Sequence, residues 1–292
     1  MDLPACVPEN KQVLLRQLVS ELRRLPGIAA IVLGGSYASG MQREDSDLDI
    51  GLYYLPEAPF EIVEIKRVAE KISTHPPTVT GFYEWGQWVN GGAWIKTKAG
   101  KVDFLYRNIA QIEHAIDNAL QGVVEQDYGQ QPTHGFYSII YLAEIEICIP
   151  LYDPLNHILR LKHLVRTYPP KLKEKVIANS LWSAEFTLAH ASSFAKNGDV
   201  YNTAGCLTRI SSNLTQALFA LNERYFIGDK RVLEIMERFA NLPEGYIKHI
   251  TGILAHPGEV ANDLMDAVVS MQTVWRGVVT LAGKYYQPKY NL

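Results

Sequence analysis

Three acidic side chains have the types and spacing to do chemistry together. Asp47 and Asp49 are two positions apart in a segment that alternates polar and apolar residues, and Asp103 lies in a later segment of the same kind. Side chains two apart on a strand point to the same face of a sheet. Two carboxylates on one face repel each other unless a cation lies between them, and Mg²⁺ prefers such oxygen ligands together with substrate phosphates. A third carboxylate on a neighbouring strand would complete a two-metal site.

A glycine turn precedes the acidic pair. A short apolar run ends in Gly34-Gly35-Ser36, and ten residues separate Ser36 from Asp47. Glycine has no Cβ, so backbone N–H groups can approach a phosphate closely. A helix that begins after Ser36 would favour an anion at its N-terminus, and the serine hydroxyl would add a hydrogen bond to a terminal phosphate oxygen. The turn and the acids together predict a nucleoside triphosphate site, with attack on the α-phosphate and loss of pyrophosphate.

Each of these residues also has a plainer interpretation. Asp47 and Asp49 can be solvated carboxylates at a strand end. Asp103 can form a salt bridge with Arg107 or Lys101. The serine of the turn can be a helix N-cap, a role that is compatible with phosphate binding. We favour the catalytic interpretation because the strand, the turn, the spacing and the three acids all occur together.

Glu185 is a further acidic candidate, in the second half of the chain. It lies three residues from both Trp182 and Leu188, so it shares an apolar helix stripe. It either pairs with a neighbour inside a helix bundle or acts as a base for an acceptor hydroxyl. The eight histidines are scattered without metal-ligand spacing and are interpreted as structural or surface residues.

An aromatic cluster lies just before the Asp103 segment. We expect it to form core and cleft wall, or to stack on a substrate ring. Its members are Phe82, Tyr83, Trp85, Trp88 and Trp94.

The candidate residues need a sheet to position them, and the first half of the chain has the patterns for one. The expected strands span residues 28–33, 47–54, 93–97 and 101–106, and the expected helices span 13–24, 61–73 and 109–120. The last two strands are joined by Lys98-Ala99-Gly100, which is a hairpin signal.

Long helical patterns replace strands after about residue 150. The expected helices span residues 154–168, 170–196, 200–225, 230–240 and 259–284, and turn residues separate them. We therefore predict an α+β protein: a mixed-sheet N-terminal domain over residues 1–150, followed by an all-α helix bundle over residues 151–292.

The glycine turn, the ten-residue gap and Asp47-Leu48-Asp49 resemble the signature of the DNA polymerase β-like nucleotidyltransferase superfamily. The resemblance covers roughly residues 25–110. It implies that Gly35 and Ser36 bind the triphosphate and that Asp47 and Asp49 ligate metal. Asp103 matches the third carboxylate, which is a metal ligand and in some members the general base.

The helical half is similar to the C-terminal domains of antibiotic nucleotidyltransferases of the kanamycin and lincosamide type. The similarity lies in residues 219–225, followed by Asp229-Lys230-Arg231. A lysine of the helical domain often reaches the triphosphate in that group, so the resemblance implies Lys230 as a phosphate ligand. The plainer interpretation of Lys230 is a solvated residue that opens a helix. Some of these relatives complete the cleft as a dimer, which leaves a homodimer open here.

The expected activity is transfer of a nucleoside monophosphate, AMP from ATP with Mg²⁺, onto a hydroxyl of a small molecule held between the two domains. Asp103, aided by Glu185, would receive the proton. A protein side chain is an alternative acceptor, although the small protein-modifying relatives lack a large helical domain. A nucleotide-binding module that has lost catalysis is a third interpretation, and the presence of all three acids counts against it.

Composition narrows the class of protein. The 28 basic and 31 acidic residues leave a net charge of −3, so no affinity for a nucleic-acid backbone is expected. The three cysteines lack CxxC spacing, which excludes a disulfide framework and a typical structural zinc site. The first ten residues lack the apolar core of a signal peptide, and no apolar run approaches the roughly 20 residues that span a bilayer. A cytoplasmic protein without membrane association is expected.

Overall fold

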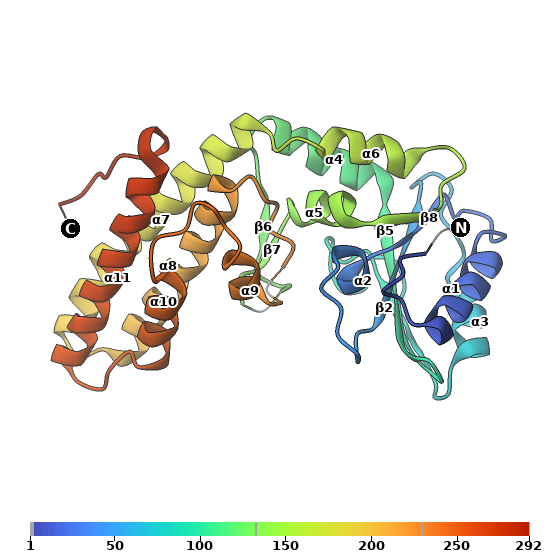
Figure 1. Cartoon of the computed structure of the whole chain (residues 1–292), viewed down its shortest axis with the longest axis horizontal. Helices are drawn as coiled ribbons and strands as arrows, with labels where there is room; N and C mark the ends of the chain where they lie inside the picture. Colours follow the sequence, from blue (N-terminus) through green and yellow to red (C-terminus); the bar gives the residue numbers. More distant parts are fainter. Residues whose placement is uncertain (1–2, 132, 229, 292) are drawn as a thin grey trace. The chain divides into compact units, whose positions relative to one another are not determined.

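The computed structural model describes residues 3–131, 133–228 and 230–291, which group into two compact units (Figure 1). The N-terminal unit consists of Met1–Asp117, Gln126–Gln130 and Phe136–Thr167, and the C-terminal unit of Asn118–Glu125, Gln131–Gly135 and Tyr168–Leu292. Asp229, which belongs to the motif quoted above for the helical half, lies outside the described residues.

The N-terminal unit alternates strands and helices. Its strands are β1 (Ala30–Leu33), β2 (Leu48–Tyr54), β3 (Thr78–Val79), β4 (Gly92–Thr97), β5 (Gly100–Asn108), β6 (Gln126–Asp127), β7 (Phe136–Tyr137) and β8 (Ile149–Tyr152). Its helices are α1 (Glu9–Leu22), α2 (Gly35–Ser39), α3 (Ile62–Ile72), α5 (Ile140–Ile147) and α6 (His157–Val165), and α4 (Ile109–Leu120) begins in this unit.

Within the described residues, the main sheet has six strands in the order β3-β4-β5-β2-β1-β8. The central pair, β2 and β5, is parallel, and the other neighbours are antiparallel. This mixed sheet, followed by long helices, confirms the predicted α+β fold class. β8 pairs with β1, opposite Val32 and Leu33. The sheet therefore continues past residue 150, and the N-terminal unit extends to Thr167.

One face of the sheet is the hydrophobic core. Alternate residues of β1, β2 and β5 point toward α1 and α3, and Figure 1 shows both helices on that side of the sheet. The core includes Ile31, Leu33, Leu48, Ile50, Leu52, Val102, Phe104 and Tyr106 from the strands, and Leu15, Leu18, Leu22, Ile65 and Val68 from the helices. Because strand side chains alternate, the polar residues between these positions must point to the opposite face.

The opposite face is covered in part by α5. The guanidinium of Arg107, at the end of β5, donates from Nε and Nη2 to the two carboxylate oxygens of Glu144, each at 2.7 Å. Arg107 is buried, and this two-pronged geometry is the strong form of an arginine–carboxylate pair. The pair holds α5 over the far end of β5 and leaves the other end of that strand open.

The C-terminal unit is helical. Its helices are α7 (Pro170–Lys196), α8 (Val200–Leu221), α9 (Val232–Met236), α10 (Tyr246–Ala255) and α11 (Ala261–Ala282), with a short 3₁₀ turn, η1 (Gly283–Tyr285). Each of α7, α8 and α11 packs against the other two (Figure 1). None of the helices in the described part of the chain has the length and apolar character that crossing a bilayer requires.

Sequence patterns miss the elements that are short or lack periodicity. In α5, five of eight residues are buried and the residues are apolar almost all round, so no amphipathic stripe marks it. The helix expected at residues 230–240 is the single short turn of α9. α1 begins at Glu9, four residues before the expected start, directly after Pro8.

Candidate active site

Two of the predicted acids are direct neighbours in the sheet. Asp49 on β2 is opposite Asp103 on β5 in the parallel register. Their sequence neighbours Leu48, Ile50 and Val102 point into the core, so both carboxylates project from the face that the core does not occupy. Adjacent strands lie about 4.8 Å apart, which sets the spacing of the two side chains. Both acids are half-buried.

Asp47 precedes β2 by one residue and is also half-buried. It lines the same surface hollow as Asp103, and its Oδ2 lies 4.0 Å from the ammonium of Lys101. Lys101 is two residues before Asp103 on β5 and therefore shares its face. The plainer interpretations of Asp103 named Arg107 and Lys101 as salt-bridge partners. Arg107 pairs with Glu144 instead, whereas Lys101 lines the same hollow as Asp103, so the interpretation with Lys101 stays a prediction.

The glycine turn lies against Asp49. The backbone N–H of Gly34 donates to the carbonyl of Asp49 at 2.8 Å. Gly35 has a φ of +58°, and a Cβ added there would stand 1.8 Å from Oδ2 of Asp49 and 2.6 Å from its Cγ. Any side chain at this position would overlap the carboxylate. Gly35 is thus required both by its left-handed backbone and by the acid that occupies the space of its missing Cβ.

Helix α2 begins at Gly35, two residues earlier than expected. Gly34 is its N-cap and has no side chain to cap with, so Ser36 is a half-buried residue of the first turn rather than the N-cap. The Ser36 carbonyl accepts hydrogen bonds from the Ser39 hydroxyl and from the Met41 N–H.

The donor chemistry of the three acids fits a hard divalent cation such as Mg²⁺. In the described part of the chain, however, no three acidic, histidine or cysteine side chains already converge closely enough to hold an ion jointly. The backbone places Asp49 and Asp103 directly opposite each other on neighbouring strands. Rotation between staggered χ1 positions can redirect a carboxylate without moving the backbone. Asp47, Asp49 and Asp103 are the residues that would hold the metal, after side-chain reorientation.

Sequence patterns did not single out Lys11, which joins the two halves of the site. Its side chain is buried, and its ammonium donates to the carbonyl of Ser46 at 2.6 Å and to the hydroxyl of Tyr37 at 3.0 Å. Ser46 directly precedes Asp47, and Tyr37 belongs to α2. A buried lysine is rare unless its charge is paired or hydrogen-bonded. The signal was present, because Lys11 falls four and seven residues before the buried Leu15 and Leu18.

The aromatic cluster divides into core and surface. Phe82 packs with Phe60 and Tyr106, and Trp88 is buried against Phe136. Trp94 lines the same hollow as Asp103, and Trp85 stacks on Trp94 with ring centroids 4.3 Å apart. Part of the cluster therefore lies in the core and part in the wall of the hollow, and stacking on a substrate ring stays a prediction.

Glu185 is enclosed in the C-terminal unit. Its carboxylate accepts hydrogen bonds from the backbone N–H groups of Lys289 and Tyr290, at 2.8 and 2.7 Å, and from the hydroxyl of Tyr286. Burial and this hydrogen bond hold the pKa of Tyr286 above its ordinary value, so the phenol stays a donor. A carboxylate that is fully buried and bound in this way has no access to a substrate hydroxyl. We therefore correct the catalytic assignment of Glu185 to the other role the sequence left open, a partner inside the bundle.

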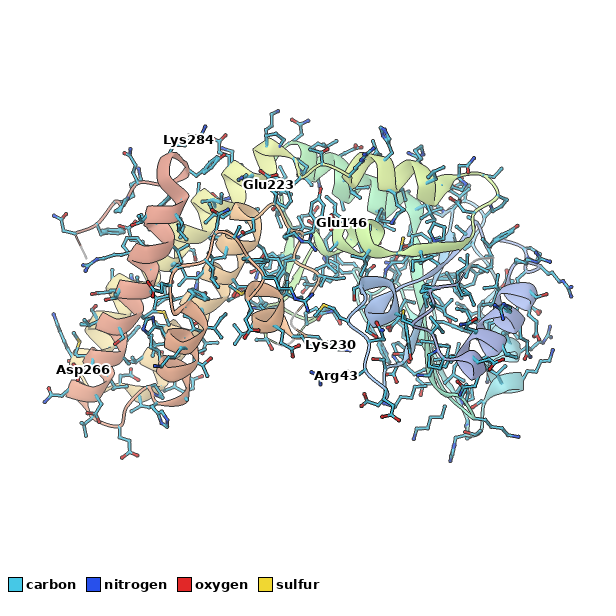
Figure 2. All side chains as sticks on the ribbon, in the orientation of Figure 1. Arg43, Glu146, Glu223, Lys230, Asp266 and Lys284 are labelled. Carbon is cyan, nitrogen blue, oxygen red and sulfur yellow. The ribbon has the colours of Figure 1, made fainter. Side chains whose placement is uncertain are left out.

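Lys230 is exposed and stands in the turn before α9 (Figure 2). Its neighbour Arg231 pairs with Glu234. This placement agrees with a solvated residue near a helix start, and the predicted role of Lys230 at the triphosphate stays a prediction.

Residues 15–112 match the family model of the nucleotidyltransferase domain. Together with the glycine turn and the register of Asp49 and Asp103, this match makes the N-terminal part of the chain a nucleotidyltransferase domain of the DNA polymerase β-like superfamily. The chain accordingly contains a nucleotidyltransferase domain. Residues 141–231 match a domain of unknown function (DUF4037). No curated protein sequence matches the chain.

Three solved structures are similar over most of the chain. A nucleotidyltransferase-like protein from Exiguobacterium sibiricum is 11% identical with a TM-score of 0.47, over 94% of this chain and 78% of that one. An aminoglycoside 6-adenyltransferase from Bacillus subtilis is 10% identical with a TM-score of 0.35, over 94% and 91%. The CdnC:HORMA-deltaN complex from E. coli MS115-1 is 13% identical with a TM-score of 0.28, over 98% and 94%.

Replacing Gly35 with alanine should abolish most activity because the new Cβ would displace the Asp49 carboxylate. We expect turnover, measured as pyrophosphate release, to fall by about 10²-fold or more, since misplacement of a catalytic group by about 1 Å has that effect. Gly40 is the matched control: its φ is +70°, but an added Cβ would meet no described atom within 4 Å. Gly40→Ala introduces similar backbone strain and should keep near-normal turnover. Equal losses in both variants would show that strain, and not the contact with Asp49, is responsible.

Replacing Lys11 with methionine should loosen the segment that carries Asp47. The Ser46 carbonyl and the Tyr37 hydroxyl would lose their donor, at a cost of about 1–3 kcal/mol in unfolding free energy. As a positioning residue, Lys11 should also affect metal use, so the magnesium concentration for half-maximal activity should rise. Lys66→Met removes a lysine that is 58% exposed and should change neither quantity. A Lys11→Met protein with lower stability but an unchanged magnesium requirement would reduce Lys11 to a purely structural role.

Replacing Glu185 with glutamine should affect stability and not catalysis. The amide has an NH₂ donor in place of one acceptor oxygen, so at least one of the groups that donate to Glu185 would lose its acceptor, which we expect to lower the unfolding free energy by about 1–3 kcal/mol. Urea denaturation measures this loss, and turnover at a temperature where both proteins are folded should stay within about twofold of the original. A large loss of turnover in the folded variant would restore the catalytic role.

Proposed function

We propose that this chain transfers a nucleoside monophosphate, AMP from ATP, to a hydroxyl group of a small molecule and releases pyrophosphate. The observation that carries the proposal is the contact between the glycine turn and Asp49, with Asp103 directly opposite Asp49 on the neighbouring strand β5. A phosphate-binding turn and two carboxylates on the same open face are the parts that nucleotidyl transfer needs at its α-phosphate.

In this proposal the turn at Gly34 to Ser36 binds the terminal phosphates. Its backbone N–H groups and the Ser36 hydroxyl are the donors, and the missing Cβ atoms allow close approach. Asp103 accepts the proton of the attacking hydroxyl. Mg²⁺, held by Asp47, Asp49 and Asp103, would neutralise the charge of the triphosphate when bound. Lys101, next to Asp47, adds a positive charge on the same face.

Two alternatives have less support. A protein acceptor is typical of small relatives that lack a large helical domain, whereas this chain has a helical C-terminal unit. A module that has lost catalysis would be expected to lose one of the acids, and all three are present. Incubation with labelled ATP and a cell lysate separates the acceptors, because a labelled protein band would indicate a protein substrate.

Replacing Asp49 with asparagine should abolish magnesium-dependent turnover while the protein stays folded. The amide keeps the shape that fits against Gly35 but loses the charge, so we expect activity to fall by about 10²–10³-fold or more. The assay is pyrophosphate release with each nucleoside triphosphate over a panel of hydroxylated small molecules. Asp45, an exposed acid in the same loop, is the control, and Asp45→Asn should keep full activity. Normal turnover in the Asp49→Asn protein would refute the assignment.

A further inference from the structure

The open face of the sheet continues beyond Asp103 into two stacked tryptophans. Trp94 on β4 is directly opposite Asp103 in the antiparallel register of β4 and β5, so the two side chains share a face. Trp85 stacks on Trp94 with an angle of 23° between the rings, and Trp85 is 44% exposed. This stack thus presents a large aromatic surface to solvent beside a carboxylate of the site.

The order of strands places this surface opposite the phosphate-binding turn. The spatial order across the sheet, starting at β1, is the glycine turn, then Asp49 on β2, then Asp103 on β5 and finally Trp94 on β4. In-line displacement requires the attacking oxygen to lie opposite the leaving pyrophosphate. If the triphosphate lies at the glycine turn, as the proposed function requires, the acceptor must approach from the β4 side.

A surface hollow extends from Asp47 and Asp103 to Trp94, the inner member of the tryptophan stack. It has a volume of about 430 Å³, and its walls include Asp47, Asp103, Trp94, Thr78 and His75. Ligand pockets for small molecules usually measure about 300–1,000 Å³. The hollow is therefore large enough for one ring compound that reaches Asp103 with a hydroxyl.

The charged side chains that line the hollow offset one another. Lys96 and Lys101 are opposite each other in the β4–β5 register, are both exposed, and both line the hollow. Asp47 and Asp103 line it too, and Asp47 lies 4.0 Å from the ammonium of Lys101, so two carboxylates balance the two ammonium groups. The hollow therefore has no excess charge to attract a polycation or a polyanion, whereas an uncharged ring can stack on an indole.

We propose that Trp94 and Trp85 form the acceptor subsite and that the acceptor is an uncharged, hydroxylated ring compound. Its flat face stacks on the indoles and presents a hydroxyl to Asp103. The hydroxyl oxygen forms the new bond to the α-phosphorus, and its proton goes to Asp103. The bond between the α-phosphorus and the bridging oxygen breaks, and its electron pair leaves with pyrophosphate. This subsite rests on the proposed function, because the position of the triphosphate defines the side of attack.

The test measures acceptor binding and nucleotide binding separately. The acceptor probe is p-nitrophenyl β-D-glucopyranoside, which is an uncharged ring with hydroxyls, and the nucleotide probe is α,β-methylene-ATP with Mg²⁺. Titration calorimetry should show that Trp94→Leu and Trp85→Leu each weaken binding of the glucoside by about tenfold or more, in line with the loss of a stacking partner. Binding of the nucleotide should change by less than about twofold, because the nucleotide site is on the β2 side.

A matched control is available in the other unit. Trp182 is 47% exposed and stacks on Phe186 at 5.4 Å, so Trp182→Leu removes a similar indole that does not line the hollow and should leave both affinities unchanged. Trp85→Leu serves as the second variant at a more exposed position, and thermal unfolding verifies that each variant is folded. Kanamycin is the polycationic probe, and because it has no aromatic ring to stack on the indoles it should bind at least about tenfold more weakly than the glucoside.

The outcomes distinguish the subsite from the proposed function. Failure of the original protein to bind the glucoside, equal binding by the folded tryptophan variants, or tighter binding of kanamycin would each overturn the acceptor subsite while nucleotide binding stood. Failure of the original protein to bind α,β-methylene-ATP would instead overturn the proposed function, and the subsite with it.

Discussion

The catalytic face depends on a contact that only glycine permits. The carboxylate of Asp49 occupies the space where any other residue at position 35 would carry its Cβ, and the backbone there is left-handed. This close approach puts the turn that we propose for phosphate and the acid that we propose for metal side by side, although they come from different strands. The Gly34 N–H, which donates to the Asp49 carbonyl, ties the same two segments together through their backbones.

Side chains alternate along each strand, and the sheet thereby keeps an apolar environment on one face and a charged one on the other. On β2 and β5, residues that face α1 and α3 are apolar and buried, whereas their neighbours Asp49 and Asp103 face the open side. Grouping acids on one face is costly, because like charges repel. The buried ammonium of Lys11 binds the segment before Asp47, and Lys101 lies beside Asp47 itself. Lysine side chains from two different elements, α1 and β5, therefore lie beside the segment that carries Asp47.

The helical unit shows that a buried acid need not be a catalytic one. Glu185 lies on an apolar stripe, as a perturbed catalytic base would, yet its oxygens bind the chain end that follows η1. Its partners are backbone N–H groups and a phenol, which satisfy a buried carboxylate without a second charge. The residue thus anchors the last segment of the chain to α7. In contrast, the stack of exposed Trp85 on half-buried Trp94 near Asp103 leaves an aromatic surface open to solvent, and it is this surface that we propose for the acceptor.

The sequence alone determined the fold class, and it was enough to predict the glycine turn and the three acids as the site, because these depend on local features: the period of a strand, the absence of Cβ atoms and a fixed spacing along the chain. Only the tertiary structure decided which residues meet. The register that sets Asp49 against Asp103, the lysine that reaches Ser46 from α1, and the C-terminal partners of Glu185 all join positions that are far apart in sequence. Such contacts arise from packing the whole sheet and bundle, and no periodicity within one segment encodes them. For the same reason the sequence placed the five aromatic residues in one cluster, whereas packing buried some of them and left Trp85 stacked on Trp94 at the open face.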